Sequence, residues 1–222
     1  MSLAALLGVR PGLTAIIGGG GKTTLMEALG RELASKGRVI LTTSAKIRRP
    51  GWLPVLDPET PGALQSALES SPMVCLGAPW PGDKLSAPSL PFSALAASAD
   101  YVLVEADGSK GLPAKAHAAH EPVIPPEAAN VILVLGAYAF DRPVSQVCHR
   151  PERFAALTGE SPEAPLTPER WAKLIRGEGY GNYIYVNKCE REQDWNNAEA
   201  LARLVRQPVV AGSLREQNFR HT

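Results

Sequence analysis

Short, unbroken hydrophobic runs recur along the chain and alternate with stretches that carry apolar residues at helical spacing. Such runs are typical of parallel strands that are covered on both faces. The pattern predicts strands at residues 13–17, 38–43, 73–77, 101–105, 131–135, 183–187 and 208–211. Strands that alternate with helices predict an α/β fold with a mostly parallel sheet flanked by helices.

The helical pattern is clearest at residues 23–36, where Leu25, Leu29 and Leu33 share one face and Gly37 ends the segment. Residues 192–206 show a second apolar face of this kind. Weaker helical patterns lie at residues 63–70, 92–98, 152–157 and 168–176. The spacing of helices and strands therefore agrees with repeated βα units.

Three connecting segments are rich in proline or glycine and fit neither period: residues 48–61, 78–91 and 108–126. We expect irregular loops there, and long loops inside a compact domain are commonly functional. A chain of 222 residues with 45% hydrophobic residues can bury a large core. We therefore expect residues 1–222 to form one domain.

Charge and cysteine content exclude several functions. Lysine and arginine number 23 against 22 acidic residues, so there is no basic excess to bind nucleic acid. Cys75, Cys148 and Cys189 lie far apart without C-x-x-C spacing, which favours buried thiols in a reducing compartment. No apolar run has the length of a membrane span, and the N-terminus lacks the basic start of an export signal. We expect a cytoplasmic protein.

A glycine loop between the first strand and the first helix is the main chemical signal. Gly18, Gly19, Gly20 and Gly21 are followed by Lys22, Thr23 and Thr24. Glycines permit backbone conformations that turn successive N–H groups around an anion. Lysine would then contact the β- and γ-phosphates of a nucleotide, the first threonine would bind Mg²⁺, and the helix N-terminus would face the negative charge. The fold we expect is the three-layer sandwich of P-loop NTPases.

The loop departs from the common G-x-x-x-x-G-K-[ST] pattern, because Ile16 stands where the first glycine is usual. The shorter form, G-x-x-G-K-T-T from Gly18 to Thr24, resembles the ATP loop of the Mur-ligase group. The alternative is a glycine-rich turn with an exposed lysine, which the strand before it and the helix after it disfavour.

Two carboxylates follow the buried strand at residues 101–105, as a Walker-B element requires. The C-terminal end of a parallel strand faces the same side of the sheet as the glycine loop. Glu105 would hold Mg²⁺ directly or through water, and Asp107 would share the metal or orient an attacking water. The alternative for Asp107 is to cap the turn beside Gly108.

Three other polar groups extend this hypothesis. Thr42, Thr43 and Lys46 end a strand and would contact the γ-phosphate or metal, although threonine is also a common strand residue. Asn187 and Lys188 resemble the N-K-x-D base-recognition motif of GTPases, with Glu190 in place of the aspartate, which weakens the case for guanine. Ser213 is a candidate for the second base-side loop.

His117 and His120 lie three residues apart in a proline-rich segment. They would fit a transition metal if the segment were helical, but the ligand set is incomplete. We therefore favour a loop that faces phosphate or substrate. His149 and Arg150 add cationic residues that either serve the same site or form a surface turn.

The motifs occur together in a known order. Residues 18–24, residues 42–46, the segment Glu-Ala-Asp-Gly-Ser-Lys-Gly from Glu105, His-Glu-Pro from His120, and Asn187-Lys188 all follow one another. On these residues the chain resembles, over nearly its full length, the YqeC-like family of selenium-dependent hydroxylase accessory proteins. The resemblance implies an intracellular nucleotide-binding protein linked to maturation of molybdenum hydroxylases, with such an enzyme or its maturation proteins as partners.

The sequence therefore predicts a protein that binds ATP or GTP with Mg²⁺ and hydrolyses the nucleotide. The residues assigned to catalysis are Lys22, Glu105 and Asp107, and the metal ligands are Thr23 and Glu105. Two alternatives remain open: an ATP-dependent ligase or kinase that acts on a small molecule, and a nucleotide sensor or scaffold without enzymatic activity.

Overall fold

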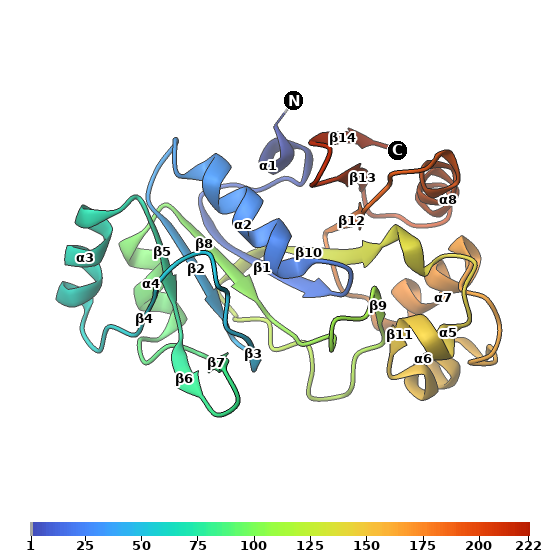
Figure 1. Cartoon of the computed structure of the whole chain (residues 1–222), viewed down its shortest axis with the longest axis horizontal. Coiled ribbons are helices and arrows are strands. Elements are labelled where there is room, and N and C mark those ends of the chain that lie inside the picture. Colours follow the sequence, from blue (N-terminus) through green and yellow to red (C-terminus); the bar gives the residue numbers. More distant parts are fainter. Residues whose placement is uncertain (1) are drawn as a thin grey trace. The chain divides into compact units, whose positions relative to one another are not determined.

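The computed structural model describes residues 2–222 and has an α/β fold (Figure 1). Nine strands form a mostly parallel sheet in the order β14-β13-β12-β10-β1-β8-β2-β5-β4, and helices flank it. The predicted fold class is therefore confirmed. Backbone packing divides the chain into two compact units. Unit 1 contains Met1–Ile16, Thr23–Gly108 and Val123–Asn130, and unit 2 contains Ile17–Lys22, Ser109–Pro122 and Val131–Thr222. The expectation of a single domain stays a prediction.

Unit 1 contains the parallel strand that ends at Glu105, with Asp107 two residues beyond it. Strands β1, β8, β2, β5 and β4 pair in that order, and each pair is parallel. The strands of unit 1 are β1 (Gly12–Gly18, which ends in unit 2), β2 (Val39–Thr43), β3 (Ile47–Arg48), β4 (Val55–Leu56), β5 (Met73–Leu76), β6 (Ala78–Trp80), β7 (Lys84–Ser86) and β8 (Tyr101–Glu105). Its helices are α1 (Leu3–Leu6), α2 (Lys22–Leu33), α3 (Pro61–Ser70) and α4 (Phe92–Ser98).

Both faces of the sheet in unit 1 are covered. Leu64 and Leu68 of α3 and Leu95 of α4 pack with Ile40 and Val102 in one buried cluster. Helix α2 packs close to the strands through Gly30, where an added Cβ would lie 3.0 Å from a methyl carbon of Leu41. Because both faces of the sheet are buried, these strands are continuous hydrophobic runs rather than alternating hydrophobic and polar residues. Such runs could be predicted from the sequence.

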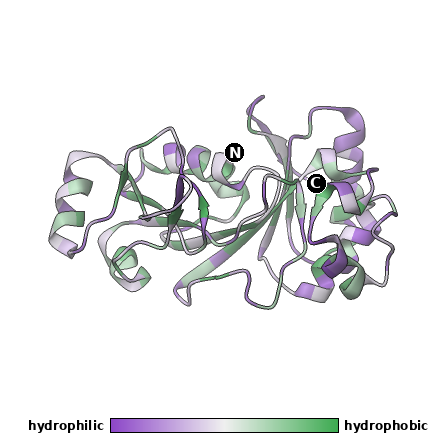
Figure 2. Cartoon of the chain, turned by 60° about the horizontal axis from the view of Figure 1, so that its bottom comes forward, coloured by the Kyte–Doolittle hydropathy of each residue, from purple (hydrophilic) through white to green (hydrophobic). Residues whose placement is uncertain are grey.

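Unit 2 is built on the parallel strands β10, β12 and β13, with β14 antiparallel at the edge. Its strands are β9 (Ala114–Lys115), β10 (Ala128–Gly136, which begins in unit 1), β11 (Cys148–His149), β12 (Tyr183–Asn187), β13 (Val209–Ser213) and β14 (Asn218–His221). Its helices are η1 (Ala137–Ala139), α5 (Val144–Val147), α6 (Pro151–Thr158), α7 (Pro168–Glu178) and α8 (Glu192–Ala202). The helices carry both hydrophilic and hydrophobic residues, as expected for helices with one buried face (Figure 2).

Each of the three predicted loops contains short strands within backbone that is otherwise largely irregular. Strand β4 lies within residues 48–61, β6 and β7 lie within 78–91, and β9 lies within 108–126. Each of these strands has only two or three residues. Such strands are too short for a hydrophobic period to be read in the sequence. Strand β4 pairs with β5, β9 pairs with β11, and β7 pairs with both β6 and β3.

Most element boundaries lie within a few residues of the predicted ones. The largest difference is in α8, which ends at Ala202 rather than at residue 206. Pro208 follows closely, and a proline disfavours helical conformation in the residue before it. No helix within residues 2–222 is both long and apolar enough to cross a membrane.

The three cysteines are buried, and their environments suppress thiolate formation. Burial raises the pKa of Cys75 to about 11 and the pKa values of Cys148 and Cys189 to about 12. Because the thiolate is the reactive form, its fraction at neutral pH falls roughly a hundredfold or more relative to an exposed thiol.

We therefore expect iodoacetamide to alkylate the folded protein very slowly and to label all three cysteines once urea unfolds it. Mass spectrometry at successive times would measure both rates. Rapid labelling of Cys148 or Cys189 in the folded protein would contradict the buried environment that the structure gives them.

Candidate functional site

The glycine loop begins at the end of β1 and adopts a backbone that requires glycine. Gly18, Gly20 and Gly21 have φ values of 95°, 77° and 118°, in the region that L side chains rarely adopt. The loop also lies against neighbouring backbone, since a Cβ added to Gly20 would lie 2.1 Å from the amide nitrogen of Gly136. The glycines are therefore needed both for conformation and for close approach.

Two amides of this loop donate to the protein itself. The N–H of Gly19 donates to the carbonyl of Val134 at 2.9 Å, and the N–H of Gly20 donates to the carbonyl of Leu112 at 3.1 Å. This differs from the expectation that all the glycine amides turn toward an anion. The amides that follow, at the start of α2, belong to the first turn of a helix, where intrahelical acceptors are lacking.

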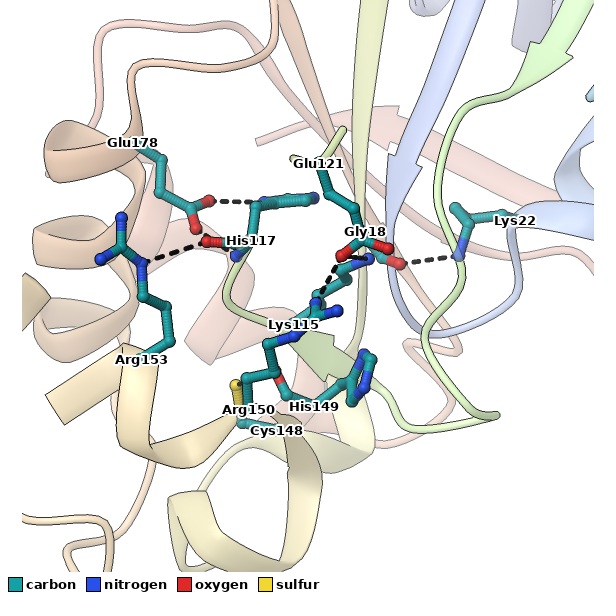
Figure 3. A network of polar contacts seen from close by, with 10 residues as sticks. All are labelled: Gly18, Lys22, Lys115, His117, Glu121, Cys148, His149, Arg150, Arg153 and Glu178. Atoms are coloured by element: carbon teal, nitrogen blue, oxygen red, sulfur yellow. Dashed lines mark hydrogen bonds and ion pairs between the residues drawn. The ribbon is translucent and has the colours of Figure 1, made fainter. Parts of the chain in front are cut away.

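Lys22 is buried at the first position of α2, with only 4% of its surface exposed. Its ammonium donates to the carbonyl of Gly18 at 2.7 Å, so the lysine side chain folds back over its own loop (Figure 3). The N-terminal end of a helix carries partial positive charge. The Lys22 ammonium and the N-terminal end of α2 therefore both place positive charge next to the glycine loop.

Thr23, the next residue, makes the contact that joins α2 to β8 within unit 1. Its hydroxyl donates to Oε2 of Glu105 at 2.7 Å. Glu105 is buried at the last position of β8, and its carbonyl accepts from the Thr43 hydroxyl at 2.8 Å. A hydroxyl and a carboxylate are hard oxygen donors of the kind that Mg²⁺ prefers, so these two residues fit a magnesium site.

Asp107 lies two residues beyond Glu105 and is fully buried. Ala106, the residue between them, is held by two backbone hydrogen bonds. Its N–H donates to the carbonyl of Ile16, and its carbonyl accepts from the N–H of Val123. A buried carboxylate is costly unless it is well paired. The backbone of unit 1 therefore holds Asp107 at a defined position next to the end of β8.

The polar residues at the end of β2 and just after it have three different kinds of surroundings. The Thr43 hydroxyl also accepts from the N–H of Ala45, so it stabilises the turn after the strand. The hydroxyl oxygen of Thr42 is buried and has no hydrogen-bond partner within residues 2–222. The Lys46 ammonium lies 3.7 Å from the ring centre of Trp80. Thr43 and Lys46 thus have partners within the protein, and their proposed contact with the γ-phosphate or metal stays a prediction.

Asn187 ties the glycine loop to the end of β12 within unit 2. Its side-chain amide donates to the carbonyl of Gly20 at 2.9 Å. Its side-chain oxygen accepts from the Tyr185 hydroxyl at 3.2 Å and from the N–H of Lys188 at 2.9 Å. The asparagine therefore fixes the loop in the way expected of the asparagine in an N-K-x-D motif.

Lys188 and Glu190 lie on the exposed side of the same turn. Lys188 has a φ of 64°, and its ammonium lies 4.5 Å from the ring centre of Tyr138. Glu190 accepts a hydrogen bond from the Ser213 hydroxyl at 3.2 Å. The structure therefore brings the three candidate base-side groups, Lys188, Glu190 and Ser213, to neighbouring positions in unit 2.

The two histidines of the proline-rich segment are in different environments. His117 is buried, and Glu178 accepts from its backbone N–H at 2.6 Å while contacting its Nδ1 at 2.7 Å (Figure 3). His120 is exposed. Within residues 2–222 no group of three or more histidine, cysteine or acidic residues is arranged to hold a metal ion.

Several contacts of the candidate site residues could not be read from the sequence. Leu112 acts through its backbone carbonyl, Tyr185 supports Asn187 from inside the strand, and Glu178 holds His117 from a distant helix. No sequence motif marks a carbonyl acceptor. The signals that residues 108–126 had a special role were their proline and glycine content, their two histidines and the motifs of the family resemblance.

Comparisons with known proteins agree with this arrangement of motifs. The family model described as YqeC protein matches residues 14–152, which include the glycine loop, Glu105 and Asp107. A protein of Escherichia coli (strain K12) named "Uncharacterized protein YqeC" is 34% identical over 176 residues, which cover 75% of this chain and 68% of that protein. The chain therefore belongs to the YqeC family.

Proposed function

We propose that this protein binds a nucleoside triphosphate with Mg²⁺ and hydrolyses it. The observation that carries the proposal is the hydrogen bond from Thr23 to Glu105, directly beside the buried Lys22. A buried ammonium, a hydroxyl and a strand-end carboxylate form the set of groups that bind a polyphosphate and its magnesium ion. The glycine loop before them supports the same ligand.

Lys22 and the start of α2 would bind the phosphates. The ammonium now donates to the Gly18 carbonyl, and a phosphate oxygen would replace this neutral acceptor with a charged one. Both bonds have a charged donor, but only the bond to phosphate joins two opposite charges and so adds ionic attraction. The exchange therefore favours the bound nucleotide even though it breaks an existing contact.

Thr23 and Glu105 would hold magnesium, which when bound neutralises negative charge on the phosphates. Few protein ligands are needed, because Mg²⁺ commonly keeps several waters and is completed by substrate phosphates. Asp107 would orient the attacking water. Its rigid backbone supports this role, since a general base acts only from a fixed position.

The base would lie beside Asn187 and Lys188. Support comes from the Asn187 contact to Gly20, which connects this turn to the glycine loop. Glu190 and Ser213 would contact the base edge, and their chemistry leaves ATP and GTP both open. The biological role we propose is an accessory one in the maturation of selenium- or molybdenum-dependent hydroxylases, with the enzyme or its maturation proteins as partners. Support for this role comes from the resemblance to the YqeC-like family of selenium-dependent hydroxylase accessory proteins.

Native mass spectrometry with ATP, GTP and CTP in turn, each with Mg²⁺, tests nucleotide binding. We expect one nucleotide per chain, and we expect Lys22→Ala to weaken its affinity about tenfold or more, because a charged hydrogen bond is lost. Lys36→Ala is the matched control, since Lys36 is exposed beside Glu32 just after α2. Binding of none of the three nucleotides by the parent protein would refute the proposal.

Paired substitutions at Thr23 test the magnesium site. Thr23→Ser keeps the hydroxyl, whereas Thr23→Val keeps the shape and removes it. We expect Mg²⁺ to strengthen ATP binding in the parent protein and in Thr23→Ser but to have little effect in Thr23→Val. Calorimetric titrations with and without Mg²⁺ would measure this difference. An equal magnesium effect in the two variants would exclude Thr23 as a ligand.

Asp107→Asn separates hydrolysis from binding. We expect nucleotide affinity to change little, while phosphate release falls by about a hundredfold or more, because the positioned base is lost. A phosphate-release assay and a binding titration on the same preparation would check both quantities. If the parent protein bound nucleotide but released no phosphate after long incubation, the protein would be a sensor rather than an NTPase.

A further inference from the structure

A group of charged side chains in unit 2 has no part in the nucleotide site described above. We call it the Glu121 cluster, and its members are Lys115, Glu121, His149 and Arg150 (Figure 3). The short parallel ladder of β9 and β11 aligns His149 with Lys115, and the N–H of Ala116 donates to the carbonyl of His149 at 3.0 Å. Backbone pairing therefore sets the positions of the cluster.

One carboxylate oxygen in this cluster serves two cations. Oε2 of Glu121 accepts from Lys115 at 2.9 Å and from Arg150. Burial alone would raise the pKa of Glu121, but hydrogen bonds from Lys115 and Arg150 outweigh it and hold that pKa below its usual value. The Lys115 side chain is fully buried, whereas Arg150 retains 22% exposure. A ligand from solvent can therefore reach the arginine but not the lysine.

Arg150 adopts an unfavourable backbone conformation in order to occupy this position. Its φ and ψ are 68° and 64°, in the left-handed region, and it precedes α6 without a side-chain cap. Glycine would adopt this conformation without strain. Strained residues of this kind cluster at functional sites, where the side chain has a role that offsets the strain.

His149 has a buried polar atom that no described residue satisfies. Its Nδ1 lacks a hydrogen-bond partner within residues 2–222. Burial lowers the pKa of His149, and the charges of Arg150, Lys115 and Lys110 lower it further, while Glu121 acts in the opposite direction. An oxyanion beside the ring would offset the surrounding positive charge and, once the ring turns Nδ1 toward it, would accept from that nitrogen.

We propose that His149 and Arg150, positioned by Lys115 and Glu121, form a subsite for a phosphate-type oxyanion. The ligand would be the phosphate group of a second substrate or the terminal phosphate of a nucleotide. All four residues of this subsite lie in unit 2, and as a site for a separate phosphate group it does not require that the glycine loop bind nucleotide. It adds a second phosphate-recognition site to the function proposed above.

Histidine NMR with inorganic phosphate as the probe tests the subsite. The protein has four histidines, and loss of a signal in His149→Gln assigns the relevant resonance. We expect phosphate to shift this signal saturably and to raise the pKa of His149. A bound anion stabilises the charged imidazolium and offsets the repulsion that it experiences from Arg150, Lys115 and Lys110. Glu121, and Glu152 in the first turn of α6, are the carboxylates to account for in the titration.

Arg150→Gly removes the cation at a position that glycine tolerates, so the variant is expected to fold. Its phosphate affinity should fall about tenfold or more. Arg203→Gly is the control for the loss of an arginine, because the Arg203 side chain is 77% exposed and distant in sequence. Unchanged phosphate affinity in Arg150→Gly, at an unchanged melting temperature, would overturn the proposal.

Lys22→Ala distinguishes the two sources of the oxyanion. If a separate phosphate group is the ligand, inorganic phosphate shifts His149 in Lys22→Ala as in the parent protein. If the terminal nucleotide phosphate is the ligand, Mg-ATP but not Mg-ADP shifts His149, and the effect disappears in Lys22→Ala. Either result supports an oxyanion subsite. Absence of a shift with phosphate and with Mg-ATP refutes it, whether or not nucleotide binds elsewhere.

Discussion

The hydrogen bond from Thr23 to Glu105 is the contact on which the proposed chemistry depends. It brings a hydroxyl from the first turn of α2 to the carboxylate at the end of β8. Parallel strands place their carboxyl ends on one edge of a sheet, so this pairing requires the parallel order of β1 and β8. In an antiparallel arrangement the two groups would lie at opposite ends of neighbouring strands. The fold thus determines whether a magnesium site can form.

The glycine loop is held from two sides before any ligand arrives. Leu112 accepts from Gly20 on one side, and Asn187 donates to the carbonyl of the same residue on the other. A loop fixed in this way loses little conformational freedom when it binds a ligand, which favours affinity. The remaining adjustment is local, since Lys22 has only to leave the Gly18 carbonyl for a phosphate oxygen.

The main strands and the glycine loop could be predicted from the sequence, because buried parallel strands are continuous hydrophobic runs and glycines mark the turn. The pairing of Asn187 with the loop followed from a motif, but the bracing by Leu112 did not, because a backbone carbonyl leaves no sequence signal. The strands β4, β6, β7 and β9 were missed because two or three residues carry no period. The sequence therefore indicated which side chains could take part in the chemistry, but it did not indicate which backbone hydrogen bonds hold the glycine loop.

Residues 109–122 connect two features of unit 2 that sequence analysis treated separately. Leu112 contacts the glycine loop through its carbonyl, and Lys115, three residues later, belongs to the Glu121 cluster. Between them, the carbonyl of Pro113 accepts from the N–H of Gly136 at 2.9 Å, which fixes the segment on β10. A shift of this segment would therefore change both the acceptor of Gly20 and the position of Lys115. Because one short segment carries both contacts, an oxyanion at the cluster and a phosphate at the loop would act on the same piece of backbone.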